Sequence, residues 1–154
     1  LSGAIAILEN NKVLNIFDMP VMSEGKKNKR QLNSAQLVNL IRDNIDSIEE
    51  TAVVVEQVNA MPGQGVTSMF NFGQTFGAIK GVCAALELPI FFVRPSKWKK
   101  HFELINSTKD ASRTKAIEMY PLISNQLAKK KDVNKSDAIL IARFFSETRL
   151  IDDK

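Results

Sequence analysis

The sequence predicts an α/β fold, and the order of its apolar segments is the basis of this prediction. Two short apolar runs, Ala52–Val55 and Ile90–Val93, have the length and composition of buried strands. The segment between them, Val66–Leu88, has apolar residues at helical spacing, and a second helical pattern precedes the first run. Strands and helices in this alternation form parallel strand pairs joined by right-handed crossovers. We therefore expect a sheet flanked by helices.

Composition narrows the class of protein. The chain has 154 residues, 44% of them hydrophobic, as expected for one domain over residues 1–154 with a buried core. Its 21 Lys and Arg against 17 Asp and Glu give a net charge of +4, which permits a polyanionic partner without requiring one. The single cysteine, Cys83, is expected to be a reduced core thiol. No apolar run reaches the roughly 18 residues of a membrane helix and no signal peptide is recognisable, so we expect no membrane partner and a cytoplasmic location.

The N-terminal segments predict a β-hairpin followed by a basic loop. Apolar strands over Gly3–Leu8 and Val13–Asp18 flank a turn at Glu9–Lys12. Asp18, at a strand end, either faces an active site or caps the turn. The segment Ser23–Arg30 is predicted to be an exposed loop whose basic residues either improve solubility or contact phosphate.

Two helices are predicted on either side of the Ala52–Val55 strand. Ser34 is the expected N-cap of a helix over Ala35–Glu49 with one apolar face. In Val66–Leu88 three glycines recur every four residues and leave a smooth face for close packing against the sheet or another subunit. These glycines are Gly73, Gly77 and Gly81. The aromatic residues of this helix are expected in the core rather than stacked on bases.

Basic residues are concentrated in the C-terminal third. Arg94–Lys100 interleaves lysines with Trp98, a pattern that suits phosphate binding with stacking, and the alternative is a solvated strand exit with Trp98 half buried. Lys109–Arg113 opens a helix that continues to Met119, and a helix N-terminus with basic side chains is a suitable phosphate site. His101 has no partner acid or second histidine at ligand spacing and is expected to be structural.

Two acidic residues at element ends are the candidates for chemistry. Glu56 follows the Ala52–Val55 strand, beside the loop Pro62–Gly65. Open α/β sheets place active sites there, and the polar end of a strand is the simpler interpretation. Asp137 lies in the first turn of a predicted helix over Asn134–Phe145, where its charge complements the helix dipole. The sequence contains no recognisable zinc site, Walker loop or nucleophile–histidine pair.

Several motifs follow the predicted elements in a characteristic order. They are Glu56-Gln57-Val58, MPGQGVTSMFNFG at Met61–Gly73, GQTFGAIKGV at Gly73–Val82, Leu88-Pro89-Ile90, the basic segments Lys97–Lys100 and Lys109–Lys115, and Lys135-Ser136-Asp137-Ala138. In this order they resemble RuvC-type Holliday junction resolvases, most closely the branch common in bacteriophages. The resemblance covers nearly the whole chain.

The resemblance implies a ribonuclease-H-like mixed sheet flanked by helices, and a homodimer that binds four-way DNA junctions. Proteins of this family cut two opposed strands by two-metal phosphodiester hydrolysis with Mg²⁺, for which Mn²⁺ can substitute. Carboxylates are the hard ligands that suit Mg²⁺, so neither histidine nor cysteine is needed. The implied protein is a crossover junction endodeoxyribonuclease of DNA recombination and repair, in the cytoplasm of a bacterial or phage-infected bacterial cell.

The resemblance also assigns residues to the site. Glu56 and Asp137 would ligate metal. Asn134 replaces an acid that many relatives carry one helical turn before Asp137, and offers an oxygen without charge. Asp132, five positions before Asp137, could substitute for that acid if the helix starts late, and Asp18 could take the place of a further metal-binding Asp that the family carries ahead of the segment matching Leu1–Ala4. The residues implied in DNA binding are Asn59, Met61, Lys97, Lys99, Lys109, Ser112 and Arg113. Because Asn59 stands where bacterial relatives often have an aromatic wedge, junction opening would fall to Met61 or the glycine loop.

One departure from the family concerns the N-terminus. In the family, an apolar strand ending in a metal-binding Asp precedes the segment that matches Leu1–Ala4. We therefore expect an N-terminally truncated nuclease domain that lacks the first, central strand of its sheet, with weak metal binding and little cleavage. The hairpin would then pair directly with the Glu56 strand, or two strand edges would face a gap that invites association with another chain.

Two other function classes remain open. A nucleic-acid-binding module that keeps this fold but no longer cleaves would fit the small set of acids, and metal-dependent nicking of a synthetic junction distinguishes it from the enzyme. A sugar-kinase or actin-like ATPase shares the strand pattern but would need glycine-rich phosphate loops around a nucleotide, which the sequence lacks.

Overall fold

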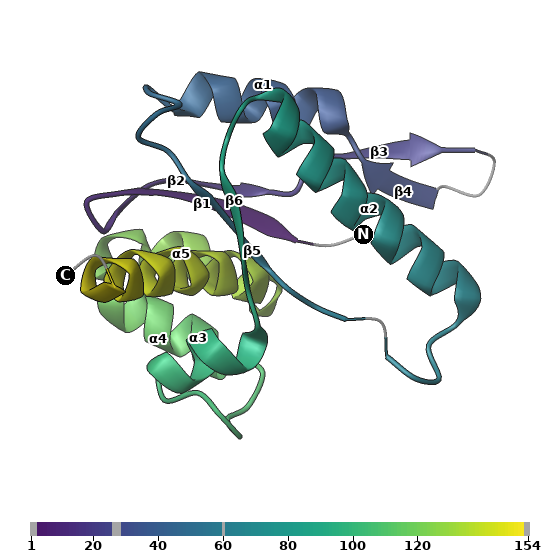
Figure 1. Cartoon of the computed structure of the whole chain (residues 1–154). Coiled ribbons are helices and arrows are strands. Elements are labelled where there is room, and N and C mark those ends of the chain that lie inside the picture. Colours follow the sequence, from purple (N-terminus) through teal and green to yellow (C-terminus); the bar gives the residue numbers. More distant parts are fainter. Residues whose placement is uncertain (1–2, 26–28, 60, 153–154) are drawn as a thin grey trace. The chain divides into compact units, whose positions relative to one another are not determined.

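The computed structural model describes residues 3–25, 29–59 and 61–152, and its elements are labelled in Figure 1. By its internal contacts the chain divides into two compact units. We call residues 19–92 the central unit, and residues 2–18 with 93–154, as far as they are described, the terminal unit. Each unit has its own set of buried apolar residues.

The central unit begins with a hairpin and a helix. β3 (Val21–Glu24) and β4 (Lys29–Leu32) pair antiparallel, so both ends of the predicted loop Ser23–Arg30 are strand residues, and residues 26–28 of that loop lie outside the described residues. α1 (Ser34–Asn44) follows. Its N-cap is Asn33 rather than Ser34, because the Asn33 side chain accepts a hydrogen bond of 3.0 Å from a backbone N–H in the first turn.

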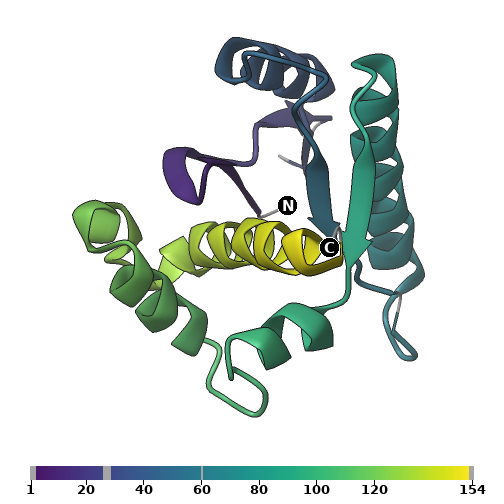
Figure 2. The same cartoon turned by 60° about the vertical axis from the view of Figure 1, so that its left-hand side comes forward.

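The rest of the central unit confirms the predicted strand–helix–strand order. β5 (Val53–Glu56) and β6 (Ile90–Val93) form a two-stranded sheet and are connected through α2 (Val66–Ala85). Figure 2 shows the two strands side by side and pointing the same way. The helix between them is the crossover that a parallel strand pair requires.

The terminal unit contains the predicted N-terminal hairpin. β1 (Ala4–Glu9) and β2 (Lys12–Asp18) pair antiparallel. Both residues of the two-residue turn have positive φ, 51° at Asn10 and 63° at Asn11. This is the backbone of a type I′ turn, whose twist matches that of the strands. The long helix α5 (Val133–Asp152) packs on β1.

Shorter helices complete the terminal unit. They are α3 (Pro95–His101), α4 (Ala111–Met119) and two 3₁₀ segments, η1 (Pro121–Leu127) and η2 (Lys130–Asp132). The sequence analysis did not predict α3. Its first residue is Pro95, whose fixed φ favours the first position of a helix. The side chains with no exposed surface include Trp98, Leu127, Ser136, Ile139 and Leu140.

The described residues form three two-stranded sheets, β1–β2, β3–β4 and β5–β6, rather than the one mixed sheet that the resemblance implies. No strand pairing joins the N-terminal hairpin to β5 in this part of the chain. The direct pairing of that hairpin with the Glu56 strand is therefore not observed. Each of β1 and β5 keeps one edge without a described strand partner.

Candidate functional site

Glu56 lies where the sequence analysis predicts it. It is the last residue of β5, and its side chain is half-buried. The loop that follows contains Gly63, whose φ of 84° favours glycine, and Gly65 is the N-cap of α2. The strand therefore delivers one carboxylate to its carboxyl end, beside a glycine-containing loop.

Asp137 is half-buried near the start of α5. Asn134 lies one helical turn earlier, so the two side chains share a face of the helix. Ser136, between them, has no exposed surface, and its hydroxyl donates to the Asp132 carbonyl oxygen at 3.2 Å. Asp137 belongs to the terminal unit and Glu56 to the central unit. Their joint action in one metal site stays a prediction.

The two acids considered as substitutes have different surroundings. Asp132 is buried, and its carboxylate accepts a hydrogen bond from the Lys129 N–H at 2.9 Å and lies 3.5 Å from the Lys135 ammonium. Burial alone would raise the pKa of the Asp132 carboxyl, but these two partners hold it below its ordinary value. Asp132 thus caps the start of η2. Asp18 is exposed at the end of β2.

The donor chemistry fits Mg²⁺. Glu56, Asp137 and Asn134 offer carboxylate and amide oxygens, and Mg²⁺ in proteins is commonly held by one or two carboxylates plus waters and substrate phosphates. Among the described residues no three His, Cys, Asp or Glu side chains come together as a metal site.

Three of the predicted DNA-contacting lysines are exposed. Lys97 and Lys99 lie on α3, and Lys109 precedes α4. None of them forms an ion pair with a described residue, and the Lys99 ammonium lies 5.6 Å from the centre of the neighbouring Trp98 ring. Asn59 and Met61, in the loop between β5 and α2, are also exposed.

Arg113 and Ser112 are positioned differently. The Arg113 guanidinium donates two hydrogen bonds to the Asp110 carboxylate, at 2.8 and 2.9 Å, and two to the carbonyl oxygens of Leu127 and Ala128. The hydrogen bond from Arg113 lowers the pKa of the Asp110 carboxyl. Ser112 is 5% exposed, and its hydroxyl has no hydrogen-bond partner in the described part of the chain. Arg113 thus joins α4 to the end of η1, and the DNA contacts of both residues stay predictions.

The burial of the aromatic residues reverses two expectations. Trp98 has no exposed surface, so it cannot stack on a base, and the stacking interpretation of the Arg94–Lys100 segment is wrong. Phe70 and Phe72, expected in the core, are 69% and 38% exposed. The helix α2 is apolar on both faces, so its periodicity could not show which side is buried.

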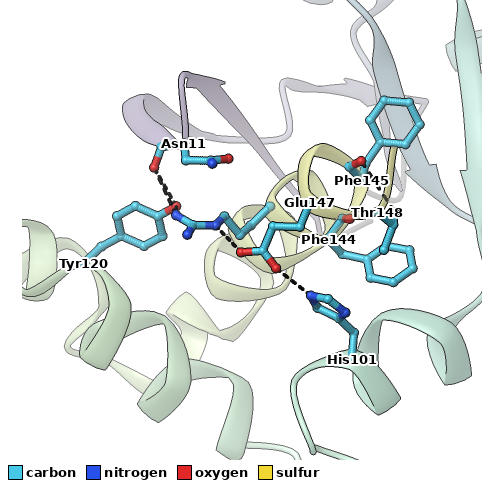
Figure 3. Close-up of polar contacts among 8 residues, drawn as sticks. Asn11, His101, Tyr120, Phe144, Phe145, Glu147 and Thr148 are labelled. Atoms are coloured by element: carbon cyan, nitrogen blue, oxygen red, sulfur yellow. Dashed lines mark hydrogen bonds and ion pairs between the residues drawn. The ribbon is translucent and has the colours of Figure 1, made fainter. Parts of the chain in front are cut away.

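A partly exposed polar network connects four elements of the terminal unit (Figure 3). His101 Nε2 and Arg143 Nε each lie 2.5 Å from one oxygen of the Glu147 carboxylate. Arg143 Nη1 donates to the Tyr120 hydroxyl at 3.1 Å, and that hydroxyl donates to the Asn11 carbonyl oxygen at 2.8 Å. Burial alone would raise the pKa of the Glu147 carboxyl, but His101 and Arg143 hold it below its ordinary value.

The acidic partner of His101 in this network is distant in the sequence. Glu147 follows His101 by 46 positions, a separation at which no local spacing rule applies. The His101 ring also packs edge-on against Phe102 and Phe144, at centroid distances of 4.8 and 5.2 Å. A structural role for His101 agrees with these contacts.

No helix of the described chain is both long and apolar enough to cross a bilayer.

Comparison with known proteins identifies the fold. No family model matches the chain, and no curated protein matches it. The chain is similar to the structure of Thermus thermophilus RuvC, with 15% sequence identity and a TM-score of 0.53 over 96% of this chain and 95% of that one. It is also similar to T. thermophilus RuvC in complex with a Holliday junction substrate, with 14% identity and a TM-score of 0.50 over 96% and 94% of the two chains. The chain therefore has a RuvC-like mixed α/β fold.

Proposed function

We propose that the chain is a metal-dependent endonuclease that resolves four-way DNA junctions in a bacterial or phage-infected cell. The observation that carries this proposal is the RuvC-like fold over 96% of the chain, with Glu56 at the end of β5. The similar structure in complex with a Holliday junction substrate supports four-way junction DNA as the partner. The exposed lysines of α3 support the same class of partner.

In this proposal Glu56 and Asp137 hold Mg²⁺ or Mn²⁺, and Asn134 adds a neutral oxygen. The bound metal would supply an activated water and neutralise charge on the phosphate during phosphodiester hydrolysis. The chain itself holds the two carboxylates on regular elements, β5 and α5. Lys97, Lys99 and Lys109 would bind the DNA backbone.

The proposal includes a homodimer, because two symmetric cuts need two sites related by a two-fold axis. One face of α2, within about a quarter of the helix circumference, is exposed along its whole length. We call it the α2 stripe, and it consists of Val66, Phe70, Gly73, Gly77, Gly81 and Ala84. A Cβ atom added at any of the three glycines would meet no other atom within 4 Å. Small residues in this arrangement let two helices approach closely.

The first test removes the proposed metal ligands. Glu56→Gln and Asp137→Asn should each reduce Mg²⁺-dependent cleavage of a synthetic four-way junction by more than about 100-fold, because each loses a charged ligand. Junction binding, measured without divalent metal, should persist, since the lysines are unchanged.

Glu50→Gln and Asp43→Asn provide matched controls, because both acids are exposed in the central unit away from β5's end. Both controls should cleave at the wild-type rate. Undiminished cleavage by either ligand variant would refute the assignment of that residue.

A catalytically impaired DNA-binding module of the same fold is the second candidate. Asn134 is neutral, the Asp132 carboxylate is engaged with Lys129 and Lys135, and the described residues hold no three-residue acid cluster. A wild-type chain that binds four-way junctions but gives no nick with Mg²⁺ or Mn²⁺ would establish this function instead.

A further inference from the structure

The carboxylate of Glu147 is the centre of the polar network in Figure 3, and the proposed nuclease site does not use it. We propose that Glu147 is a positioning residue, which through His101 fixes the orientation of α3 and of the two lysines that α3 presents to DNA. The inference rests on the proposed function, because it takes DNA as the partner of Lys97 and Lys99. All four residues belong to the terminal unit.

The orientation of α3 depends on tertiary contacts. The helix has seven residues, Pro95–His101, and a helix of this length is not stable by itself in water. Trp98, in its middle, has no exposed surface, so it anchors the helix at one point. One anchor leaves a helix free to tilt and rotate about that point. His101 is the last residue of α3 and follows Trp98 by three positions, so it supplies a second anchor on the same face.

The second anchor is a directed polar contact. His101 Nε2 lies 2.5 Å from one oxygen of the Glu147 carboxylate. Burial opposes the charge of this carboxylate, but His101 and Arg143 hold the pKa of the Glu147 carboxyl below its ordinary value. The group is therefore ionised at neutral pH and can only accept, so His101 Nε2 carries a proton and donates it. Phe102 and Phe144 pack edge-on against the His101 ring and limit its rotation.

The other oxygen of the same carboxylate is held as well. It accepts from Arg143 Nε at 2.5 Å, and Arg143 Nη1 donates to the Tyr120 hydroxyl at 3.1 Å. That hydroxyl donates to the Asn11 carbonyl oxygen at 2.8 Å, in the β1–β2 turn. The ion-paired side chains of the network are 27% to 29% exposed, and ion pairs with such exposure contribute little to stability. The main consequence of the network is therefore orientation.

The lysines follow any movement of α3, because they flank its buried face. Successive residues of a helix are about 100° apart, so Lys97 and Lys99 lie on the two sides of Trp98. Both lysines are exposed, and neither forms an ion pair with a described residue. The helix that anchors α3 also carries Asp137, ten positions before Glu147 and about 15 Å away along the helix axis. Glu147 therefore fixes both lysines relative to the proposed metal ligand.

The first experiment separates positioning from charge. Glu147→Gln removes a negative charge, which by electrostatics alone should tighten DNA binding slightly. Because Glu147 positions α3, the variant should instead raise the Kd for a synthetic four-way junction by about tenfold, measured without divalent metal. Glu118→Gln is the matched control, because it makes the same change of charge at an exposed position of α4. The control should leave the Kd unchanged or lower it.

A double-mutant cycle tests whether the effect passes through the lysines. Lys97→Gln/Lys99→Gln should raise the Kd by at least about tenfold near 0.1 M salt. Adding Glu147→Gln to that variant should raise the Kd no further, because the contacts that Glu147 positions are already lost. A merely structural role predicts instead that the two losses multiply.

Two substitutions of His101 separate its donor from its ring. His101→Phe keeps an aromatic ring but has no N–H, and it should weaken binding as Glu147→Gln does. His101→Gln loses the ring but keeps an N–H donor, and it should bind the junction more tightly than His101→Phe. Circular dichroism should show both variants folded at the assay temperature.

The second experiment needs no DNA. Cys83 is 1% exposed, so a nitroxide label attached to a Ser96→Cys variant reports the mobility of α3. Introducing Glu147→Gln should add a mobile component to the electron paramagnetic resonance spectrum of this label. The same label on a Ser68→Cys variant, at an exposed position of α2 in the central unit, should not respond.

The outcomes separate the positioning role from the proposed function. The positioning role alone is overturned by an unchanged nitroxide spectrum, by a Kd for Glu147→Gln no higher than that of the wild type, or by losses that multiply in the cycle. Wild-type chain that binds no four-way junction refutes the proposed function. A label mobilised by Glu147→Gln in that chain would still assign Glu147 to the orientation of α3.

Discussion

The helices α2 and α5 are both 20 residues long, but the chain buries them very differently. On α5, Ser136, Ile139 and Leu140 have no exposed surface, and the helix packs on β1 and α4. On α2 only Val82 and Cys83 are buried. A helix that is apolar on all sides is normally buried on all sides, so the exposed α2 stripe indicates a further partner. The second copy in our proposal would supply that cover.

The two helices also differ in their polar contacts. Arg143 and Glu147 connect α5 to α3, to α4's end and to the β1–β2 turn through directed hydrogen bonds. The one Lys or Arg of α2, Lys80, has its ammonium 5.8 Å from the Phe76 and Phe92 ring centres. Directed hydrogen bonds fix one arrangement, whereas apolar contacts on an open face permit several. We therefore expect α5 to tolerate substitution less well than α2.

Truncating one apolar side chain on each helix should show the largest difference. Leu140→Ala removes a fully buried side chain and should lower the free energy of unfolding by about 2–5 kcal/mol. Phe70→Ala removes a 69% exposed ring and should change the free energy of unfolding of the monomer by less than about 0.5 kcal/mol.

Urea unfolding at low protein concentration can measure both variants. Trp98 fluorescence reports the terminal unit and circular dichroism reports the whole chain, since Trp98 is the one tryptophan and is fully buried. Equal losses for the two variants would contradict the burial difference between α2 and α5.

The Glu147 network should show a smaller and pH-dependent effect. Glu147→Gln leaves the amide able to hydrogen-bond but removes its charge, and should destabilise the chain by about 1–2 kcal/mol at neutral pH. The folded pKa of Glu147 is lowered, so its contribution is present above the unfolded value of about 4.3 and is lost as pH falls through the folded value.

The difference in Tm between the wild type and this variant should therefore be constant above about pH 5 and decrease in more acidic solution. Glu118→Gln, at an exposed position of α4, should follow the wild type throughout. A difference that grows on acidification would show that the carboxylate is not stabilised by His101 and Arg143.

Local patterns were sufficient for some elements and not for others. β6 matches its predicted bounds, and β5 brings Glu56 to its end as expected, because a short β-branched run between breakers specifies a buried strand. The β3–β4 pairing is not predicted from the sequence, because the basic residues of Ser23–Arg30 resemble those of a solvated loop. The start of α3 was recognisable from Pro95, and this signal was overlooked.

The remaining features depend on tertiary packing. The contact of His101 with Glu147 spans 46 positions, and the burial of Trp98 depends on the helices that surround it. The structure places Glu56 at the end of β5 as predicted, whereas Asp137 lies in the second turn of α5 rather than the first, because that helix begins at Val133. No local pattern places the two acids relative to one another, because they belong to different units.

The smallest expected effect has opposite signs in the monomer and the dimer, and it tests the α2 stripe directly. Gly77 lies in the middle of the stripe, and an added Cβ would meet no atom within 4 Å. Because alanine favours a helix over glycine by up to about 1 kcal/mol, Gly77→Ala should raise the Tm of the monomer by a few degrees. In a dimer packed through the stripe, the added methyl groups would separate the two helices and raise the Kd of self-association.

Asn71→Ala is the matched control. Asn71 is exposed on another side of α2, so this substitution raises helix propensity without changing the stripe. Sedimentation equilibrium of the three proteins should show weaker association for Gly77→Ala alone. An unchanged Kd in that variant would place the dimer interface elsewhere, and α2 would then need a different partner for its open face.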